Sequence, residues 1–332
     1  MIKLLKDKEV NEKQWELLIY NSYTASFFQT KTCYDFFCSL SFMKSFVYGV
    51  EENGQLKGLV CGYVVADGGL LVKKFSSRVI IPGGLLLDDN ITNEALSALL
   101  NFLKNNLYRK AIYIEIRNYV DYSDYKKLLE TNGFLYQPHI NLHVHTNKST
   151  DILFKNLKKE KQRQIKQAKK NGLISIETED INDITSFYKL LKKLYNNIHL
   201  PLFPIEFFKK IVKLENTHLI VIKRKDKIIG GILLVTDFKK VYEWYIVGDY
   251  ENAENKYSSV LATWEGIRFA AENDFETFDF MGAGKPEKEY GVRNFKKKFG
   301  AIELETGRYL YICHKFLYSL GKLIFEKIIK NK

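Results

Sequence analysis

The sequence lacks the long apolar segment that a membrane-spanning helix needs. Its longest apolar runs, Gly58–Ala66 and Val79–Leu87, have nine residues each, whereas a spanning helix takes about 20. The first ten residues, MIKLLKDKEV, contain no apolar core of a secretory signal. The 4 cysteines form no Cys-x-x-Cys pair, so the usual spacing of a structural zinc site is missing. We therefore expect a reduced, cytoplasmic protein without a metal site.

Arginine is scarce, although the chain is basic. Of 51 basic residues only 8 are arginine, and 39 acidic residues leave a formal net charge of +12. Residues 1–150 hold 17 basic and 15 acidic side chains, a net of +2, whereas residues 151–332 hold 34 and 24, a net of +10. The excess of positive charge lies in the second part of the chain, where we expect an anionic ligand.

A hairpin, a helix and a strand occur twice in the same order, which indicates an internal repeat. Phe46–Val65 and Leu219–Thr236 each read as two apolar runs around a charged turn, the pattern of a β-hairpin. Helical periodicity and then a short strand with one acidic residue follow each hairpin. These segments are a helix over 93–107 and a strand over 113–116 in the first copy, and a helix over 258–272 and a strand over 278–280 in the second.

Two copies of one α/β unit explain this order, and a chance similarity of the two segments is the alternative. We place the domains at residues 1–150 and 151–332. The second domain opens with a basic helix, Lys155–Lys170, which contacts an anion or forms a solvated face. It ends with an amphipathic helix, His314–Lys332, which docks on its own domain or touches a membrane surface.

The segment Thr277–Gly300 is the richest in candidate functional residues. A strand over 278–281 ends in Gly-Ala-Gly, which allows the close approach of a ligand to the backbone. Four basic side chains follow as candidates to hold a phosphate, a carboxylate or a developing oxyanion, namely Lys285, Lys288, Arg293 and Lys296. The alternative is a mobile surface loop with solvated lysines.

Several motifs resemble those of a known family in the same order. FDFMGAG (278–284) and YGVRNFKKKFG (290–300) are similar to the C-terminal signature of the Fem-type aminoacyltransferases, a GNAT-related group of N-acyltransferases. The resemblance covers nearly the whole chain. Its other parts are SFFQ (26–29), KQRQIKQAKKNG (161–172), PIEFF (204–208) and NKYSSVLATW (255–264).

The resemblance implies two tandem GNAT-like domains, each a mixed, mostly antiparallel sheet flanked by helices, without the coiled-coil arm that some members carry. It implies transfer of an aminoacyl group from aminoacyl-tRNA to an amine, as in members that act on the stem peptide of a peptidoglycan precursor. No bound cofactor is implied, because the tRNA is a co-substrate. Contact with a membrane would be peripheral at most.

The resemblance also suggests roles for individual residues. Lys296, in the Phe-Lys pair of the signature, is the candidate to stabilise the oxyanion. A general base could be Asp279 or Glu115, and the alternative is that such a strand carboxylate pairs with a nearby Lys or Arg117. The members that grip a pyrophosphate use a Lys and an Arg that have no clear match here, although Lys31 is close to the first. The predicted substrate-binding residues are Arg293, Phe295, Lys285, Tyr257, Glu115, Arg163 and Lys166.

Two other functions stay open. A GNAT-type enzyme would use an acyl-CoA to acetylate a small amine or amino sugar, but Gly248–Ser259 lacks the Arg/Gln-x-x-Gly-x-Gly/Ala pattern that usually cradles the CoA pyrophosphate. A non-catalytic member of the fold would bind RNA or another anionic polymer through its basic second half.

Overall fold

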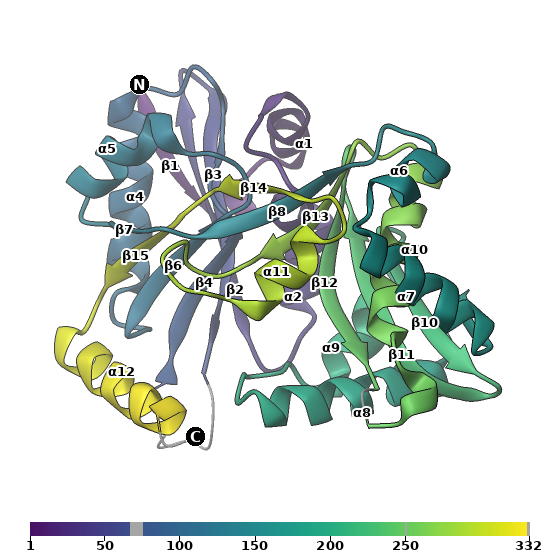
Figure 1. Ribbon diagram of the computed structural model, residues 1–332. Helices are drawn as coiled ribbons and strands as arrows, with labels where there is room; N and C mark the ends of the chain where they lie inside the picture. The colour runs from purple at the N-terminus through teal and green to yellow at the C-terminus, as the bar shows by residue number, and fades with distance from the viewer. Residues whose placement is uncertain (67–75, 250, 331–332) are drawn as a thin grey trace. The chain divides into compact units, whose positions relative to one another are not determined.

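The computed structural model describes residues 1–66, 76–249 and 251–330, and side chains as far as residue 323. Its contacts divide the chain into two units. The first unit consists of Met1–His139 and Glu305–Lys332, and the second of Ile140–Leu304. Each unit is built on one sheet with helices packed against both faces (Figure 1).

The sheet of the first unit has the order β1–β2–β3–β4–β6–β15–β7, with the short β5 beside β3. Its strands are β1 (Ile2–Lys6), β2 (Lys44–Glu52), β3 (Gln55–Val65), β4 (Arg78–Gly83), β5 (Leu86–Leu87), β6 (Tyr113–Asn118), β7 (Leu135–Gln137) and β15 (Arg308–Ile312). Its helices are α1 (Glu12–Asn21), α2 (Lys31–Cys38), α4 (Asn93–Leu107), α5 (Ser123–Thr131) and α12 (Lys315–Lys330), with short 3-10 turns η1 (Asp7–Glu9) and η2 (Phe27–Gln29).

Alternation along the strands gives this sheet two apolar faces. Val47 and Cys61 belong to a core with Trp15 of α1, while Phe46 and Tyr48 belong to the core that α4 and α5 complete. Helix α4 begins as predicted, because the Thr92 hydroxyl accepts a hydrogen bond from the Ala95 amide. Four leucines at helical spacing bury its inner face, namely Leu96, Leu99, Leu100 and Leu103.

The sheet of the second unit has the order β9–β10–β11–β12–β13–β8–β14. Its strands are β8 (Ile140–His145), β9 (Leu173–Glu177), β10 (Thr217–Arg224), β11 (Lys227–Thr236), β12 (Lys240–Gly248), β13 (Thr277–Gly282) and β14 (Ile302–Glu305). Its helices are α6 (Thr150–Asn156), α7 (Lys159–Lys170), α8 (Ile181–Asn197), α9 (Ile205–Ile211), α10 (Ser258–Glu272) and α11 (Gly291–Lys297), with a 3-10 turn η3 (Ala253–Asn255).

The two sheets confirm the predicted repeat. In each, an antiparallel hairpin leads to a third strand, a 15-residue helix and a strand that pairs in parallel with the third one; these parallel pairs are β4 with β6 and β12 with β13. The other pairs with a described register are antiparallel. The predicted mixed, mostly antiparallel sheets are therefore present in both units.

The division of the chain differs from the predicted boundary after residue 150. Strand β8 pairs with β13 of the second sheet, although it precedes residue 151. Strand β15 pairs with β6 and β7 of the first sheet, although it lies near the C-terminus. Figure 1 shows the yellow β15 among the blue strands and the teal β8 beside β13. The apolar alternation of a strand indicates which of its side chains are buried, but it does not indicate which sheet the strand joins.

Two helical predictions change in detail. The basic segment Lys155–Lys170 is divided between α6 and α7, with Leu157 and Lys158 in extended conformations between them. In α12, Phe316 and Leu320 of the predicted apolar side are exposed, whereas the ring of Tyr318 contacts that of Tyr113. Among the described residues, no helix combines the length and apolarity needed to cross a membrane.

Tyr309 tests the contribution of the C-terminal strand to the first unit. It lies on β15, is 1% exposed and belongs to the same core as α4. We expect Tyr309→Ala to lower the free energy of unfolding by roughly 3–5 kcal/mol, as for other buried aromatic side chains. Urea unfolding followed by circular dichroism measures this loss. Tyr20→Ala is the control, because Tyr20 is 78% exposed; equal stability of the two variants would contradict the assignment of β15 to this core.

Candidate active site

Strands β12 and β13 pair only over a short distance and then separate. Their parallel register runs from Lys240–Thr277 to Tyr242–Asp279. Beyond it, the register of β12 with β11 shifts between Leu233 and Leu234, and that of β13 with β8 shifts after Asp279. Met281 has φ = 57°, a left-handed conformation that is uncommon for a residue with a side chain. Because of these irregularities, main-chain carbonyl groups near the end of β13 do not bond to a neighbouring strand. They accept hydrogen bonds from side chains instead.

Lys296 is held by such main-chain groups. It lies on α11, is 7% exposed, and its Nζ donates to the carbonyl oxygens of Phe280 at 2.6 Å and Gly282 at 3.3 Å. The same Nζ lies 3.5 Å from Oε1 of Glu243 on β12. The ammonium group thus has a protein acceptor for each of its three N–H donors. The structure brings the predicted oxyanion-stabilising lysine to the point where the two strands separate.

Glu243 is the residue that the sequence analysis missed. It directly follows the last β12 residue that pairs with β13, and it is 6% exposed. Burial is the main cause that raises the pKa of Glu243 to about 7, and the charge of Asp279 also raises this pKa. The positive charge of Lys296 acts in the opposite direction and lowers it. The signal was a single acid within the otherwise apolar and aromatic segment VYEWYIV. A carboxyl with this pKa exchanges a proton near neutral pH.

Asp279 is fully buried on the neighbouring strand. Its Oδ1 accepts a hydrogen bond from the Met281 amide at 2.6 Å, and its Oδ2 lies 3.1 Å from Nε2 of His143 on β8. His143 on the adjacent strand thus has an acidic neighbour. Asp279 therefore fixes the left-handed Met281 near the end of β13. The charges of Lys296 on α11 and of Asp279 on β13 both act on Glu243.

Arg293 shapes the loop that follows β13. Its guanidinium donates to the carbonyl oxygens of Ala283 at 3.0 Å, Pro286 at 3.2 Å and Lys285. Arg293 is buried, whereas the Lys285 side chain is exposed. The structure thus uses the predicted anion-binding arginine to close a turn, and leaves Lys285 accessible.

Phe295 connects α11 to the basic helix α7. The ammonium of Lys161 lies 4.2 Å from the centre of the Phe295 ring, in a cation–π contact. Lys161 is buried, and burial lowers its pKa to about 8. Phe295 is therefore part of the packing between two helices of the second unit.

The remaining basic residues of α7 face solvent. Arg163 and Lys166 are exposed, and with Lys159 and Lys170 they line a shallow depression along the helix. Such a row of cations suits the phosphates of a nucleic acid.

Tyr257 precedes helix α10 with φ = 74°. No side chain caps the helix at this residue. The backbone of β12 comes very close, since a Cβ on Gly248 would lie 2.7 Å from the Ser259 nitrogen. The hydroxyl of Ser258 is buried and, within the part of the chain described, has no hydrogen-bond partner. This helix end can accept an anion.

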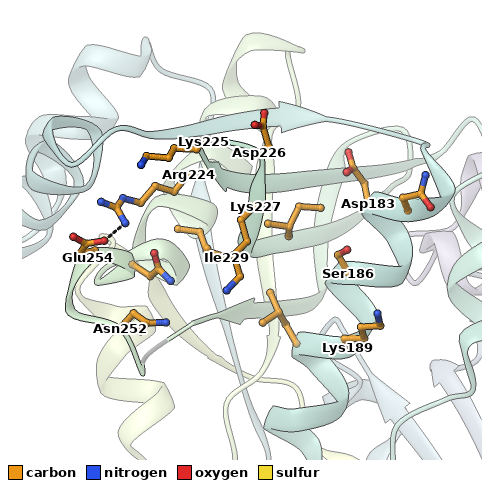
Figure 2. Close-up of a pocket in the computed structure, with 14 residues that line it drawn as sticks. Asp183, Ser186, Lys189, Arg224, Lys225, Asp226, Lys227, Ile229, Asn252 and Glu254 are labelled. Carbon is orange, nitrogen blue, oxygen red and sulfur yellow. Dashed lines mark hydrogen bonds and ion pairs between the residues drawn. The ribbon is translucent and has the colours of Figure 1, made fainter.

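A groove of roughly 850 Å³, which the sequence did not indicate, is present in the second unit, and Figure 2 shows the residues that line it. It lies between α8, the turn of the β10–β11 hairpin and the segment before α10. Lys227 crosses the hollow, with Lys189 on one wall and Asn252 on another, and Arg224 forms an ion pair with Glu254 at the rim. The groove mixes both signs of charge around the apolar Ile228 and Ile229.

Glu115 belongs to the first unit, on the strand that corresponds to β13. It forms ion pairs with Arg117 at 2.7 Å and Arg308 at 2.9 Å. Burial alone would raise its pKa, but the two guanidinium groups lower the pKa to about 2. A carboxylate of such low basicity is a poor general base at neutral pH, so the geometry favours a structural ion pair at this position.

The described residues contain no group of three or more His, Cys, Asp or Glu side chains that could hold a metal ion. The polar groups of the candidate site are amines, carboxyls and main-chain carbonyls. They suit proton transfer and the stabilisation of charge.

Comparison with known proteins agrees with this architecture. Residues 155–296 match the family described as the acetyltransferase (GNAT) domain. The fold is similar to that of FemX, with a TM-score of 0.71 and 17% identity over 96% of this chain and 99% of that one. No curated protein matches the sequence.

Two further structures share the fold. One is a tandem GNAT protein from the clavulanic acid biosynthesis pathway, with a TM-score of 0.61 and 7% identity over 94% of this chain and 99% of that one. The other is the C-terminal domain of a putative lysylphosphatidylglycerol synthetase from Agrobacterium fabrum, with a TM-score of 0.53 and 11% identity over 80% and 84%. The prediction of tandem GNAT-like domains is confirmed.

The raised pKa of Glu243 predicts a pH-dependent effect on stability. The folded state keeps the Glu243 proton to higher pH than the unfolded state does, so this stabilisation is present below a pH of about 4.3 and is lost as the pH rises towards 7. Glutamine does not titrate. We therefore expect Glu243→Gln to gain roughly 1–3 kcal/mol in unfolding free energy, relative to wild type, between pH 5 and pH 8. Urea unfolding at both pH values measures this, and a difference independent of pH would disprove it.

Proposed function

We propose that the chain transfers an aminoacyl group from aminoacyl-tRNA to an amine, since residues 155–296 match the acetyltransferase (GNAT) domain family and the fold is similar to those of FemX and of a tandem GNAT protein. The acceptor that we propose is the stem peptide of a peptidoglycan precursor, in line with the Fem-type motifs. The observation that carries the proposal is the buried ammonium of Lys296 at the end of β13, beside Glu243 and within a segment that resembles the Fem signature.

The reaction needs a positive group near the acyl carbonyl. A neutral amine attacks the ester carbon, and the tetrahedral intermediate carries a negative oxygen. Two rigid main-chain carbonyls hold the Lys296 ammonium in place at the end of β13. Asp279 is a positioning residue, because it fixes Met281 and with it the backbone that holds Lys296.

The exposed cations of α7 support tRNA as the donor. Arg163 and Lys166 lie on one accessible surface with two further lysines, and phosphates release counterions when such residues bind them. Counted by the units of the structure, residues 1–139 with 305–332 carry 22 basic and 17 acidic side chains, a net of +5, and residues 140–304 carry 29 and 22, a net of +7. The row of cations on α7, rather than the overall charge, therefore makes the second unit favourable for a polyanion.

A specific observation favours a second candidate, an acyl-CoA donor. The uncapped N-terminus of α10, next to Gly248 and the buried Ser258 hydroxyl, is a suitable place for a pyrophosphate. Thermal unfolding with acetyl-CoA separates the two donors. If micromolar acetyl-CoA stabilises the protein and a small amine or amino sugar is acetylated, the donor is an acyl-CoA and not aminoacyl-tRNA.

Lys296→Met tests the proposed oxyanion role. We expect kcat to fall about 10²–10³-fold, because one charge-stabilising donor is lost. The assay incubates the enzyme with charged tRNA and muropeptide precursors and detects the added residue by mass spectrometry. Lys297→Met is the matched control, since Lys297 is an exposed neighbour on the same helix; equal turnover of the two variants would refute the role of Lys296.

A double variant tests the tRNA surface. Arg163→Gln with Lys166→Gln should weaken tRNA binding and reduce the slope of log K against log salt by about 1–2, since up to two phosphate contacts are lost. Lys8→Gln with Lys13→Gln removes the same charge from the first unit and serves as control. Unchanged tRNA binding by the α7 variant would show that tRNA binds to another surface. Binding of RNA by the wild type without any acyl transfer would instead support a non-catalytic binding protein.

A further inference from the structure

Glu243 has one carboxylate oxygen that lacks a partner. Its Oε1 faces Lys296 at 3.5 Å, while Oε2 is buried without a hydrogen bond from any described residue. A buried, ionised oxygen in this state is costly. Protonation of this oxygen removes the buried negative charge, so the surroundings of Oε2 favour the neutral form of Glu243.

Lys296 has a related constraint. Its N–H donors are directed to the carbonyls of Phe280 and Gly282 and to Glu243. An oxyanion must replace one of these acceptors. The carbonyls belong to the backbone and keep their partial charge, whereas Glu243 loses its negative charge when it is protonated. Glu243 is therefore the partner that can release the ammonium.

We propose that Glu243 accepts the proton lost by the attacking amine and thereby transfers the ammonium of Lys296 from its own carboxylate to the oxyanion. The inference rests on the proposed acyl transfer. As the N–C bond forms, the amine proton moves to Oε2 and the carbonyl electron pair moves to the oxygen that Lys296 stabilises. When the intermediate collapses, the bond from carbon to the leaving oxygen breaks, and the proton passes from Glu243 to that oxygen.

The surroundings favour this coupled step because the total charge of the buried site stays constant. One negative charge disappears from Glu243 as another appears on the substrate, and Lys296 neutralises each in turn. The titratable groups around Glu243 are Lys296 of α11, Asp279 of β13 with its neighbour His143 of β8, and Tyr195 of α8. The burial-raised pKa of about 7 agrees with a proton acceptor at neutral pH.

Kinetics of Glu243→Gln test the proposal. Transfer is measured from pH 5.5 to pH 9 for wild type, Glu243→Gln and Glu265→Gln. The last is the matched control, because Glu265 is an equally buried glutamate that forms ion pairs with Lys169 and Arg268 on another part of the unit. We expect Glu243→Gln to lower kcat about 10²–10⁴-fold and to abolish the rise of kcat/KM through pH 7, with KM little changed. The control should keep the wild-type pH profile.

A second measurement does not require turnover. Infrared difference spectra between pH 5 and pH 9 should show a protonated carboxylic acid that titrates near pH 7 in wild type, is missing in Glu243→Gln and titrates at higher pH in Lys296→Met. A wild-type profile in Glu243→Gln, or a carboxyl band unaffected by Lys296→Met, would overturn the inference. A wild type inactive with every donor would refute the proposed function, and the infrared titration alone would then decide whether Glu243 and Lys296 exchange charge.

Discussion

The separation of β12 from β13 is the constraint on which the candidate site depends. A regular sheet would bond the carbonyls of Phe280 and Gly282 to a neighbouring strand. Here the register shifts after Asp279, Met281 takes a left-handed conformation, and the carbonyls bind Lys296 instead. The fixed Asp279–Met281 bond and the buried position of Lys296 beside Glu243 both follow from this interruption.

The different roles of neighbouring basic residues also follow from the separation of β12 and β13. Arg293 holds three carbonyls of the loop after β13 and leaves the loop's lysines exposed, while Lys296, one helical turn further on, is drawn into the unit. Lys161 is buried against Phe295, whereas Arg163 and Lys166 on the same helix face solvent. Formal charge alone therefore says little about which cations are available to a ligand.

Local patterns predicted the elements of the fold well. The helices at 93–107 and 258–272 were recovered with their observed ends, since the apolar spacing of each helix lies within one segment, as does the Thr92 cap of the first. The assignment of β8 and β15 was not predictable, because both strands pair with residues more than a hundred positions away and their alternation fits either sheet. Lys296 and Asp279 were found through glycine and basic motifs. Glu243 was missed because its chemistry depends on burial and on a lysine 53 positions further along the chain.

The position of β15 has a consequence for the order of folding during synthesis. Strand β7 has its sheet neighbour in β15, and β15 also completes the edge of β6. The ribosome makes both of these acceptor strands before residue 140 but delivers their partner only after residue 307. The whole second unit can therefore fold while the first still has an open sheet, and an unpaired edge of this kind invites wrong pairings. Although it comes first in the sequence, the N-terminal sheet is the last to be finished.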